Sequence, residues 1–565
     1  ASALYGTAAA NGVILITTKR GRPGTTQWSS WVEQGAIDDI TDYQNNYLTY
    51  NVIDSSAPLF TSSGFFNRAD TDDDDIIDTY DYCYNRRAAA GVCTQDGTLS
   101  FNTMEDSRTT PYQTGIRGRY GASVRGGTEQ VRYFVSAQYE DEEGVIDINT
   151  LDELNFRANL DAELSETADL SVSFGYTDSE IALNNNDNSI FSPIINGILG
   201  QAYYVPPDES REYGAPVNDA NYGFGFSMEE LRNLPFFQSV DRNITSANLR
   251  WRPTSWLTVN AQGGLDLTST HNYETLQPDK LPIAYSYAQG YRDSERAKDY
   301  LYTALISGVS TFELTSDLVS TTTVGGQYTL DNSENTECYG YSLVPGTASC
   351  GTVADGYFID EDFFEVRTVG GYVQEELAWR DRVFIAGGLR ADDNSAFGQD
   401  FDLAYYPSAS ISWVIGEEPW FPEMDWLNTL RVRGAWGVSG LRPNFREATT
   451  LYQPTTVATS AGDRPGISLD VTGNTQLKPE RTAEYEFGFD TGVFDDRVTL
   501  EFTYFNKTSE DALIDRRLPG SLGLTTSVID NLGSIENSGT ELAVNFSVIE
   551  TQSFGFSFGF TNTSL

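Results

Sequence analysis

The chain has 565 residues, with 36 Lys and Arg against 81 Asp and Glu, and a formal net charge of −45. Phosphate binding needs a basic surface, so this charge argues against a nucleic-acid partner. The 32 Tyr, 31 Phe and 50 Gly stand beside 3 Met and 1 His. Aromatic belts and Gly-containing turns of a membrane β-barrel produce this balance, which is unusual for a soluble enzyme. We interpret the acidity as a solvated surface in a salty medium; acidic loops that gather cations are the alternative.

The hydropathy pattern contains no apolar run that approaches the roughly 18 residues of a transmembrane helix. Residue 1 is not followed by a secretory signal peptide. Neither feature excludes a membrane, because barrel strands alternate in polarity and give only a weak signal.

The N-terminal segment begins with a stretch rich in small residues, 1–10, that is typical of a helix end. Asn11-Gly12 follows and predicts a turn, since Gly tolerates positive φ and Asn tolerates the left-handed conformation. The β-branched run 13–18 predicts a short buried strand. Lys19-Arg20-Gly21 then forms a basic exit.

From about Trp28 onward, many segments alternate in polarity with a period of two. The clearest are 131–139, 170–176, 498–504 and 554–560. Each predicts a strand with one apolar face and one polar or small face. In a barrel the apolar face meets lipid, whereas in a soluble sandwich it forms a core.

The connections between these strands are of two kinds. Short polar turns predict tight hairpins at 166–168, 253–255, 380–382 and 495–497. Long stretches with little periodicity predict irregular loops at 40–117, 180–242, 277–296, 332–360 and 441–478. Short turns at one end and long loops at the other are typical of outer-membrane barrels. We count roughly 17 strands; plugged transporter barrels have about 22, so about five are expected beyond Leu565.

The four cysteines form two local pairs, Cys83 with Cys93 and Cys338 with Cys350, flanked by Asp, Asn, Gly and Tyr. We predict two short disulfide-closed loops in an oxidising compartment. The alternative is free or partly paired thiols. No Cys-x-x-Cys or Cys/His metal spacing competes with these interpretations.

Five segments, in order, resemble TonB-dependent outer-membrane transporters of the SusC/RagA type. Segment 1–19 (ASALYGTAAANGVILITTK) resembles the end of their plug domain. The other four are 390–415 (RADDNSAFGQDFDLAYYPSASISWVI), 430–440 (LRVRGAWGVSG), 477–513 (LKPERTAEYEFGFDTGVFDDRVTLEFTYFNKTSEDAL) and 531–546 (NLGSIENSGTELAVNF). Each alone is weak, but five in one order on a barrel-like background are specific.

The resemblance implies an all-β chain, an antiparallel transmembrane β-barrel with long extracellular loops and the last strand of a plug. Residues 1–21 would be the C-terminal end of the plug, and 22–565 the barrel, truncated at its C-terminus. The plug-to-barrel segment would pack rather than do chemistry, and includes Gly6, Asn11, Gly12 and Lys19. We expect a fragment that lacks most of the plug, the TonB-contacting segment and the closing strand, and whose open edges prevent a stable barrel.

The resemblance also implies function: energised uptake of a nutrient too large for porins, an oligosaccharide or a peptide, across the outer membrane of a Gram-negative bacterium. Expected partners are a TonB-type energy-transducing protein, a SusD-like surface lipoprotein that lids the barrel, and outer-membrane lipid. The alternative is a secreted or surface-exposed β-rich adhesin without transport. A regular Ig-like array would repeat every ~100 residues, and none is seen; a passive porin is disfavoured by the plug-like segment.

Four features are candidates for binding or chemistry. The acidic run 70–75 with Asp78 is a candidate for Ca²⁺, but Asp75 occupies the position where a calcium loop needs Gly, so a solvated loop is preferred. His271, the only histidine, supports neither a metal site nor a triad. Seven tryptophans at strand ends or turns predict an interface girdle rather than a soluble core: Trp251, Trp256, Trp379, Trp413, Trp420, Trp426 and Trp436.

Aromatic residues in the long loops could hold a sugar or peptide ligand, with loop self-packing as the equal alternative. The candidates are Tyr203, Tyr204, Tyr222 and Phe224, with Phe226, Tyr285 and Tyr287 beside them. No nucleotide-binding, serine-hydrolase or zinc-protease motif is present. The sequence therefore supports no enzyme and no cofactor.

Overall fold

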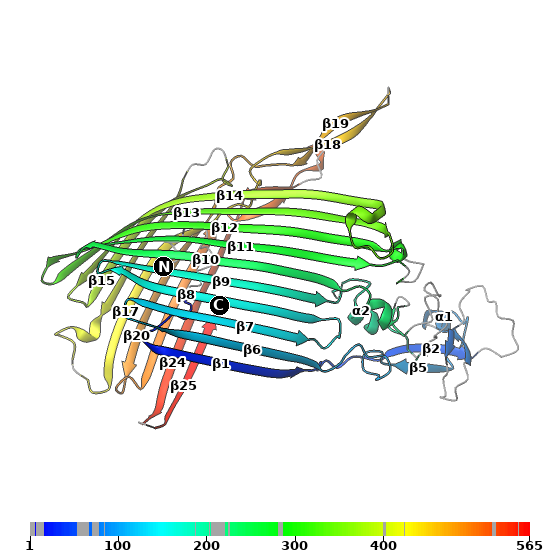
Figure 1. Cartoon of the computed structure of the whole chain (residues 1–565), viewed down its shortest axis with the longest axis horizontal. Coiled ribbons are helices and arrows are strands. Elements are labelled where there is room, and N and C mark those ends of the chain that lie inside the picture. The colour runs from blue at the N-terminus through cyan, green and yellow to red at the C-terminus, as the bar shows by residue number, and fades with distance from the viewer. Residues whose placement is uncertain are drawn as a thin grey trace.

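The computed structural model gives the chain as a predominantly β-structured molecule (Figure 1). It describes residues 6, 16–52, 67–69, 78–83, 85–186, 188–202, 204, 221–223, 226–278, 280, 286–398, 403–422, 424–460, 462–522, 527–551 and 553–565.

One antiparallel sheet of 17 strands dominates the fold, as the sequence predicted. Its first strand, β1 (Gly24–Ile37), pairs with β6 (Gly115–Gly127), and the following strands pair in chain order as a meander. They are β7 (Val131–Glu143), β8 (Thr150–Ser165), β9 (Ala168–Leu183), β10 (Phe236–Thr254), β11 (Leu257–Leu276), β12 (Tyr291–Thr315), β13 (Leu318–Leu343), β14 (Val353–Trp379), β15 (Val383–Asn394), β16 (Ala404–Val414), β17 (Leu427–Leu441), β20 (Glu480–Val493), β21 (Val498–Glu510), β24 (Ser534–Glu550) and β25 (Gly555–Ser564).

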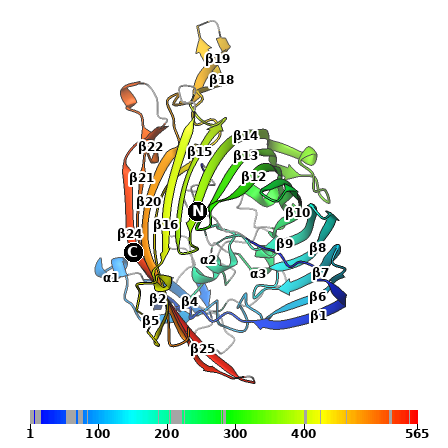
Figure 2. The same ribbon diagram turned by 90° about the vertical axis from the view of Figure 1, so that its left-hand side faces the viewer.

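The sheet curves around a central space (Figure 2). This curvature gives the sheet an inner face and an outer face. In the described part of the chain, no ladder joins β25 to β1.

Smaller sheets and hairpins lie at the end of the large sheet where the long connections are (Figure 1). A four-stranded sheet has the order β3–β4–β2–β5, and two further hairpins are β18–β19 and β22–β23. Their bounds are β2 (Asn46–Val52), β3 (Asn67–Ala69), β4 (Asp78–Tyr82), β5 (Gly97–Phe101), β18 (Leu451–Thr459), β19 (Gly462–Val471), β22 (Leu513–Arg517) and β23 (Ser527–Asn531). The helices are α1 (Asn85–Ala89), α2 (Pro193–Ile198) and α3 (Met228–Leu231), with short 3₁₀ turns η3 (Ser286–Gln289), η4 (Cys350–Thr352), η5 (Ile415–Glu417) and η6 (Gly520–Leu522).

Each of the four predicted tight turns joins neighbouring strands of the sheet. Two are shorter than predicted, because Pro253 and Thr254 belong to β10 and Ala168 begins β9. Among the described residues, no helix is long and apolar enough to cross a membrane.

The prediction of an irregular loop over 332–360 is wrong for most of that range. β13 continues to Leu343 and β14 starts at Val353, and the two strands stay paired from Leu318–Trp379 to Leu343–Val353. Beyond the membrane both faces of a strand meet water, so polar residues occupy both faces and the period of two disappears. The predicted loop is a continuous hairpin.

The two faces of the sheet differ in polarity along each strand, as β8 illustrates. Leu154, Phe156 and Leu160 are exposed on one face, at 42%, 37% and 43%. Asn159 and Asp161 alternate with them on the inner face and are only 4% and 7% exposed. Apolar residues exposed outward and polar residues turned inward are the arrangement of a barrel in lipid.

Six tryptophans lie at the end of the sheet with the short turns. Trp251, Trp379 and Trp413 are near the ends of β10, β14 and β16, and Trp256, Trp420 and Trp426 lie in the connections that follow β10 and β16. Trp436 lies within β17 instead. An indole can be half apolar and half wet, so this row suits one membrane–water interface.

Gly121→Ala should destabilise the sheet. A Cβ on Gly121 would overlap the indole of Trp31, its cross-strand partner on β1, and overpacking of this kind costs about 1–3 kcal/mol. Gly263→Ala is the matched control, because a Cβ there would meet nothing within 4 Å. Urea unfolding of both variants in lipid vesicles checks this; equal free energies of unfolding would contradict the Trp31 packing.

Candidate functional site

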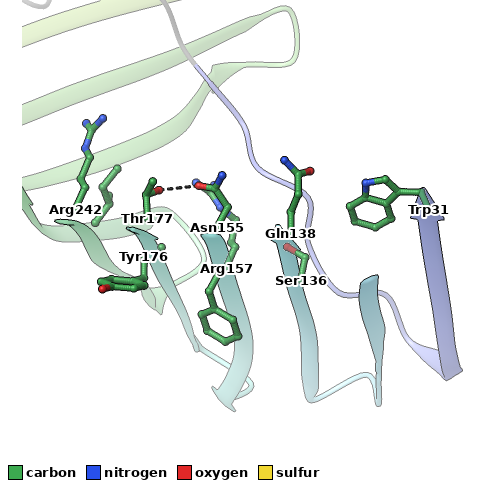
Figure 3. A pocket seen from close by; sticks show the side chains of 11 residues that line it. Trp31, Ser136, Gln138, Asn155, Arg157, Tyr176, Thr177 and Arg242 are labelled. Atoms are coloured by element: carbon green, nitrogen blue, oxygen red, sulfur yellow. Dashed lines mark hydrogen bonds between the residues drawn. The ribbon is translucent and has the colours of Figure 1, made fainter. Parts of the chain in front are cut away.

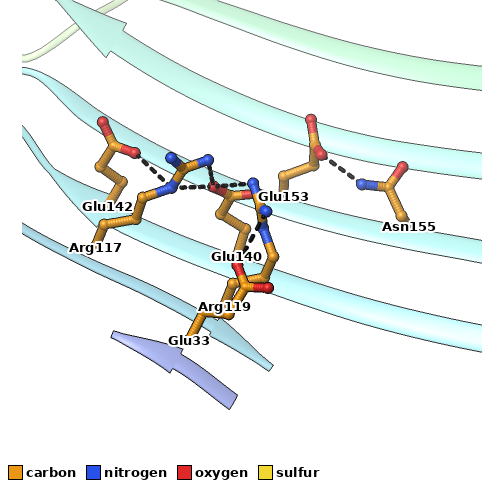
Figure 4. A network of polar contacts seen from close by, with 7 residues as sticks. All are labelled: Glu33, Arg117, Arg119, Glu140, Glu142, Glu153 and Asn155. Carbon is orange, nitrogen blue, oxygen red and sulfur yellow. Dashed lines mark hydrogen bonds and ion pairs between the residues drawn. The ribbon is translucent and has the colours of Figure 1, made fainter. Parts of the chain in front are cut away.

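The inner wall near β1, β6 and β7 holds a network of charged side chains (Figure 4). Glu140 is at its centre: its carboxylate accepts hydrogen bonds from Arg117 Nε at 2.6 Å and from Arg119 Nε at 3.0 Å. Arg119 also reaches Glu33 at 3.2 Å, and Arg117 reaches Glu142 at 3.3 Å. The Glu140 side chain is 5% exposed and that of Glu33 is 63% exposed. Glu140 therefore ties β6 to β7 from within the wall.

A hollow of about 300 Å³ lies next to this network. Figure 3 shows Gln138, Asn155, Thr177 and Arg242 on the neighbouring strands β7 to β10, with Trp31 at the end of the row. Thr177 donates a hydrogen bond to Asn155 Oδ1 at 2.7 Å. Amide, hydroxyl and guanidinium groups beside an indole can bind polar ligands through hydrogen bonds and a flat apolar face.

The segment before β1 is anchored to the inner wall of β8 and β9. Asn159 Nδ2 donates to the backbone oxygen of Lys19 at 2.6 Å and to Thr18 Oγ1 at 3.3 Å. Arg20 forms a 2.6 Å ion pair with Asp161 and donates to Ser171 Oγ at 3.0 Å. Lys19 is therefore held on the inner face of the sheet by its backbone oxygen.

The last three residues of the predicted strand 13–18 are not in a strand. Ile16, Thr17 and Thr18 have no regular structure, and Ile16 is 81% exposed, because no described strand pairs with them. Residues 13–15 lie outside the described residues, as do Asn11 and Gly12.

Gly6, the other described residue of this segment, lies against a different part of the wall. Its backbone oxygen accepts a hydrogen bond from the Gly440 N–H of β17 at 3.2 Å. The N-terminal segment therefore contacts the inner wall at two separate places, one on β17 and one on β8 and β9.

Both cysteine pairs are disulfides. Cys83 is bonded to Cys93 and Cys338 to Cys350, with Cα–Cα distances of 5.9 and 6.3 Å. Cys338 lies on β13, and Cys350 begins η4 in the connection to β14. This second bridge closes the outer end of the long hairpin.

Tyr222, one of the loop aromatics named as ligand candidates, is buried in the structure. It is 2% exposed, its hydroxyl donates to the Thr109 oxygen at 2.6 Å, and burial raises its pKa. It packs in an apolar cluster whose other members are Phe191, Phe226, Leu231, Leu234, Leu276 and Tyr291. Loop self-packing, the alternative interpretation, describes this residue.

The other loop aromatics give less information about a ligand. The Tyr204 ring lies 4.0 Å from the guanidinium carbon of Arg108, which is paired with Asp106. One face of Tyr204 is thus covered. Tyr203, Phe224 and Tyr285 lie outside the described residues, and Tyr287 packs against the cluster that contains Tyr222.

The described residues contain no cluster of side chains that could hold a metal ion. Among them, no three His, Cys, Asp or Glu side chains gather around one point, while the acidic run 70–75 lies outside the described part. His271 on β11 has its Nε2 3.0 Å from Ser294 Oγ, and its ring centroid lies 4.8 Å from that of Tyr273, with the two rings tilted by 33°. It packs into the wall.

Sequence reasoning missed the polar groups of the inner wall. A signal was present, because Arg117 and Arg119 on one strand and Glu140 and Glu142 on the next have the spacing that puts them on one face. The register needed to bring Arg119 opposite Glu140 was not readable from the spacing alone.

Glu140→Gln should lower the free energy of unfolding by about 2 kcal/mol. This is less than the ~3–5 kcal/mol for a fully buried pair, because both guanidinium groups remain partly exposed. Glu33→Gln removes the exposed partner of the same network and should change little. Urea unfolding in lipid vesicles compares them; equal losses would show that Glu140 is not the centre of the network.

Comparisons with known proteins place the chain in a family. The profile of the family described as "TonB dependent receptor-like, beta-barrel" matches residues 196–564. TonB-dependent receptor P3 of Formosa agariphila is 23% identical over 99% of this chain and 53% of that protein. SusC of Bacteroides thetaiotaomicron is 22% identical over 100% of this chain and 55% of that protein. The chain thus spans about half the length of these curated relatives.

The solved structure of the RagAB peptide transporter has the same fold. It superposes on 100% of this chain and 64% of its own chain, with a TM-score of 0.73 and 16% sequence identity. The predicted resemblance to the SusC/RagA type is confirmed. The family profile covers more than half of this chain. The chain therefore belongs to the TonB-dependent receptor β-barrel family of the Gram-negative outer membrane.

Proposed function

We propose that the protein is an outer-membrane importer that takes up a nutrient such as an oligosaccharide or a peptide by TonB-dependent transport. The single observation that supports this most is the N-terminal segment inside a membrane β-sheet, held to the inner wall at Gly6 and again at residues 18–20. A porin has a water-filled interior and an adhesin needs no segment there. We assign residues 1–21 to the end of a plug and 22–565 to the barrel.

The proposed partners follow from this assignment. A TonB-type protein in the periplasm would supply the force that moves the plug, and a SusD-like surface lipoprotein would cover the end with the long loops. The similarity to SusC, and the likeness to a chain of a peptide transporter, support this kind of assembly. Calcium on the acidic stretch 70–75 remains a proposal of the sequence.

Polar groups on the inner wall would guide the ligand once the plug moves. Gln138, Asn155 and Thr177 present amide and hydroxyl groups that can bond hydroxyl or peptide groups, beside Arg242, whose guanidinium is paired with Asp266. Most of these side chains are uncharged, so a hydrated ligand can exchange water for them at little cost. Passage needs such weak, replaceable contacts, because a ligand that binds too tightly does not leave.

Deletion of the native gene should abolish growth on one nutrient class, oligosaccharide or peptide. The full-length gene should restore growth, and uptake of the labelled nutrient should fall to the deletion level when the energy-transducing partner is also removed. Uptake that continues without that partner would indicate a passive pore. Unchanged uptake with reduced attachment to surfaces would favour the adhesin.

A further inference from the structure

The N-terminal segment meets the wall beside a buried ion pair on β15. Arg390 Nε donates to Asp392 Oδ1 at 2.7 Å, and the two side chains are 3% and 0% exposed. Arg390 Nη2 also donates to Gln327 Oε1 on β13 at 3.0 Å. Two residues apart on one strand, Arg390 and Asp392 share the inner face, so the pair belongs to the wall itself.

Two wall glycines leave room at this place, one beside the ion pair and one beside the Gly6 oxygen. Gly370 of β14 is the cross-strand partner of Asp392, and a Cβ there would overlap Asp392 Oδ1. Gly440 of β17 lies 3.2 Å, N to O, from the Gly6 oxygen, and a Cβ on it would lie 2.5 Å from Tyr406 Oη. Tyr406 is 2% exposed, and its hydroxyl has no hydrogen-bond partner among the described residues. The wall is therefore shaped for a close approach of backbone.

Gly6 makes that approach. Its φ of +60° is a left-handed conformation that glycine adopts more readily than any residue with a side chain. A Cβ on Gly6 would overlap both Asp392 Oδ2 and Arg390 Nε. Conformation and space thus independently require a residue without a side chain at position 6.

We propose that Arg390, Asp392, Gly370 and Gly440 form a socket that accepts Gly6 and positions the N-terminal segment against the inner wall. This inference rests on the proposed function, in which that segment is the end of a plug. The socket residues are positioning residues, since they act on the ligand path only through the segment.

The contact at the Gly6 oxygen is a neutral backbone hydrogen bond, donated by the Gly440 amide. The Arg390–Asp392 bond and the Arg390–Gln327 bond lie within the wall and are made without Gly6. An ion pair, such as the one between Arg20 and Asp161 at the other contact, is costlier to break, because it leaves a charge uncompensated. A socket of this design suits a contact that must open and re-form in each cycle.

Gly6→Ala in the full-length protein tests the socket. The variant should lose the hydrogen bond from the Gly440 amide, so hydrogen exchange of that amide should become about tenfold faster. Gly24→Ala is the matched control: its φ of +126° is also unfavourable for alanine, but a Cβ there would meet nothing within 4 Å. Exchange at Gly440 should stay unchanged in this control.

Gly370→Ala is a second test of the socket, because the new Cβ on β14 would push the Asp392 carboxylate of β15 out of its place. It should also accelerate exchange at Gly440, and folded barrels are first confirmed by their heat-dependent gel mobility. Slow exchange at Gly440 in both Gly6→Ala and Gly370→Ala would overturn the socket. Hydrogen exchange does not depend on transport, so it tests the socket separately from the function. A negative result in the nutrient-uptake experiment would reject the proposed function and leave the socket untouched.

Discussion

The structure depends on one requirement: a backbone that crosses lipid must pair its N–H and C=O groups within the protein. A strand meets this requirement only through its neighbours, and after β6 the sheet grows as hairpins in chain order. Side chains alternate along every paired strand, so pairing also divides each strand into an outward row and an inward row. The apolar exterior and the polar interior are therefore consequences of the same hydrogen bonds.

An inward row of polar residues creates a second requirement, that charges in the wall be neutralised where they stand. Glu140 is neutralised by guanidinium groups from the neighbouring strand, which connects β6 to β7. Asp392 is neutralised by Arg390 on its own strand. The first arrangement fastens the wall together, whereas the second leaves the wall unchanged when something else touches it. Both arrangements thus use an arginine paired with a carboxylate.

The sequence predicted what depends on alternation and could not predict what depends on register. Strand β21 was readable, because Leu500, Phe502 and Tyr504 meet lipid while polar residues separate them. The outer half of β14 was not, since both of its faces meet water. Gly6 and Lys19 were identified by resemblance, but the partner of Lys19 lies 140 positions away in the chain, at Asn159. Local spacing contains no information about such a contact.

The lengths of the strands also explain the acidity of the chain. β12, β13 and β14 have 25, 26 and 27 residues, whereas a tilted strand needs about 9–11 to cross the membrane. The tryptophans mark one interface near the short turns, so most of the extra length lies on the other side, above the membrane. Asp355, Asp360, Glu361, Asp362 and Glu365 all lie in that part of β14. Hydrated carboxylates are stable there and would be costly in lipid. A large negative charge is therefore compatible with a membrane protein whose longest strands continue into water.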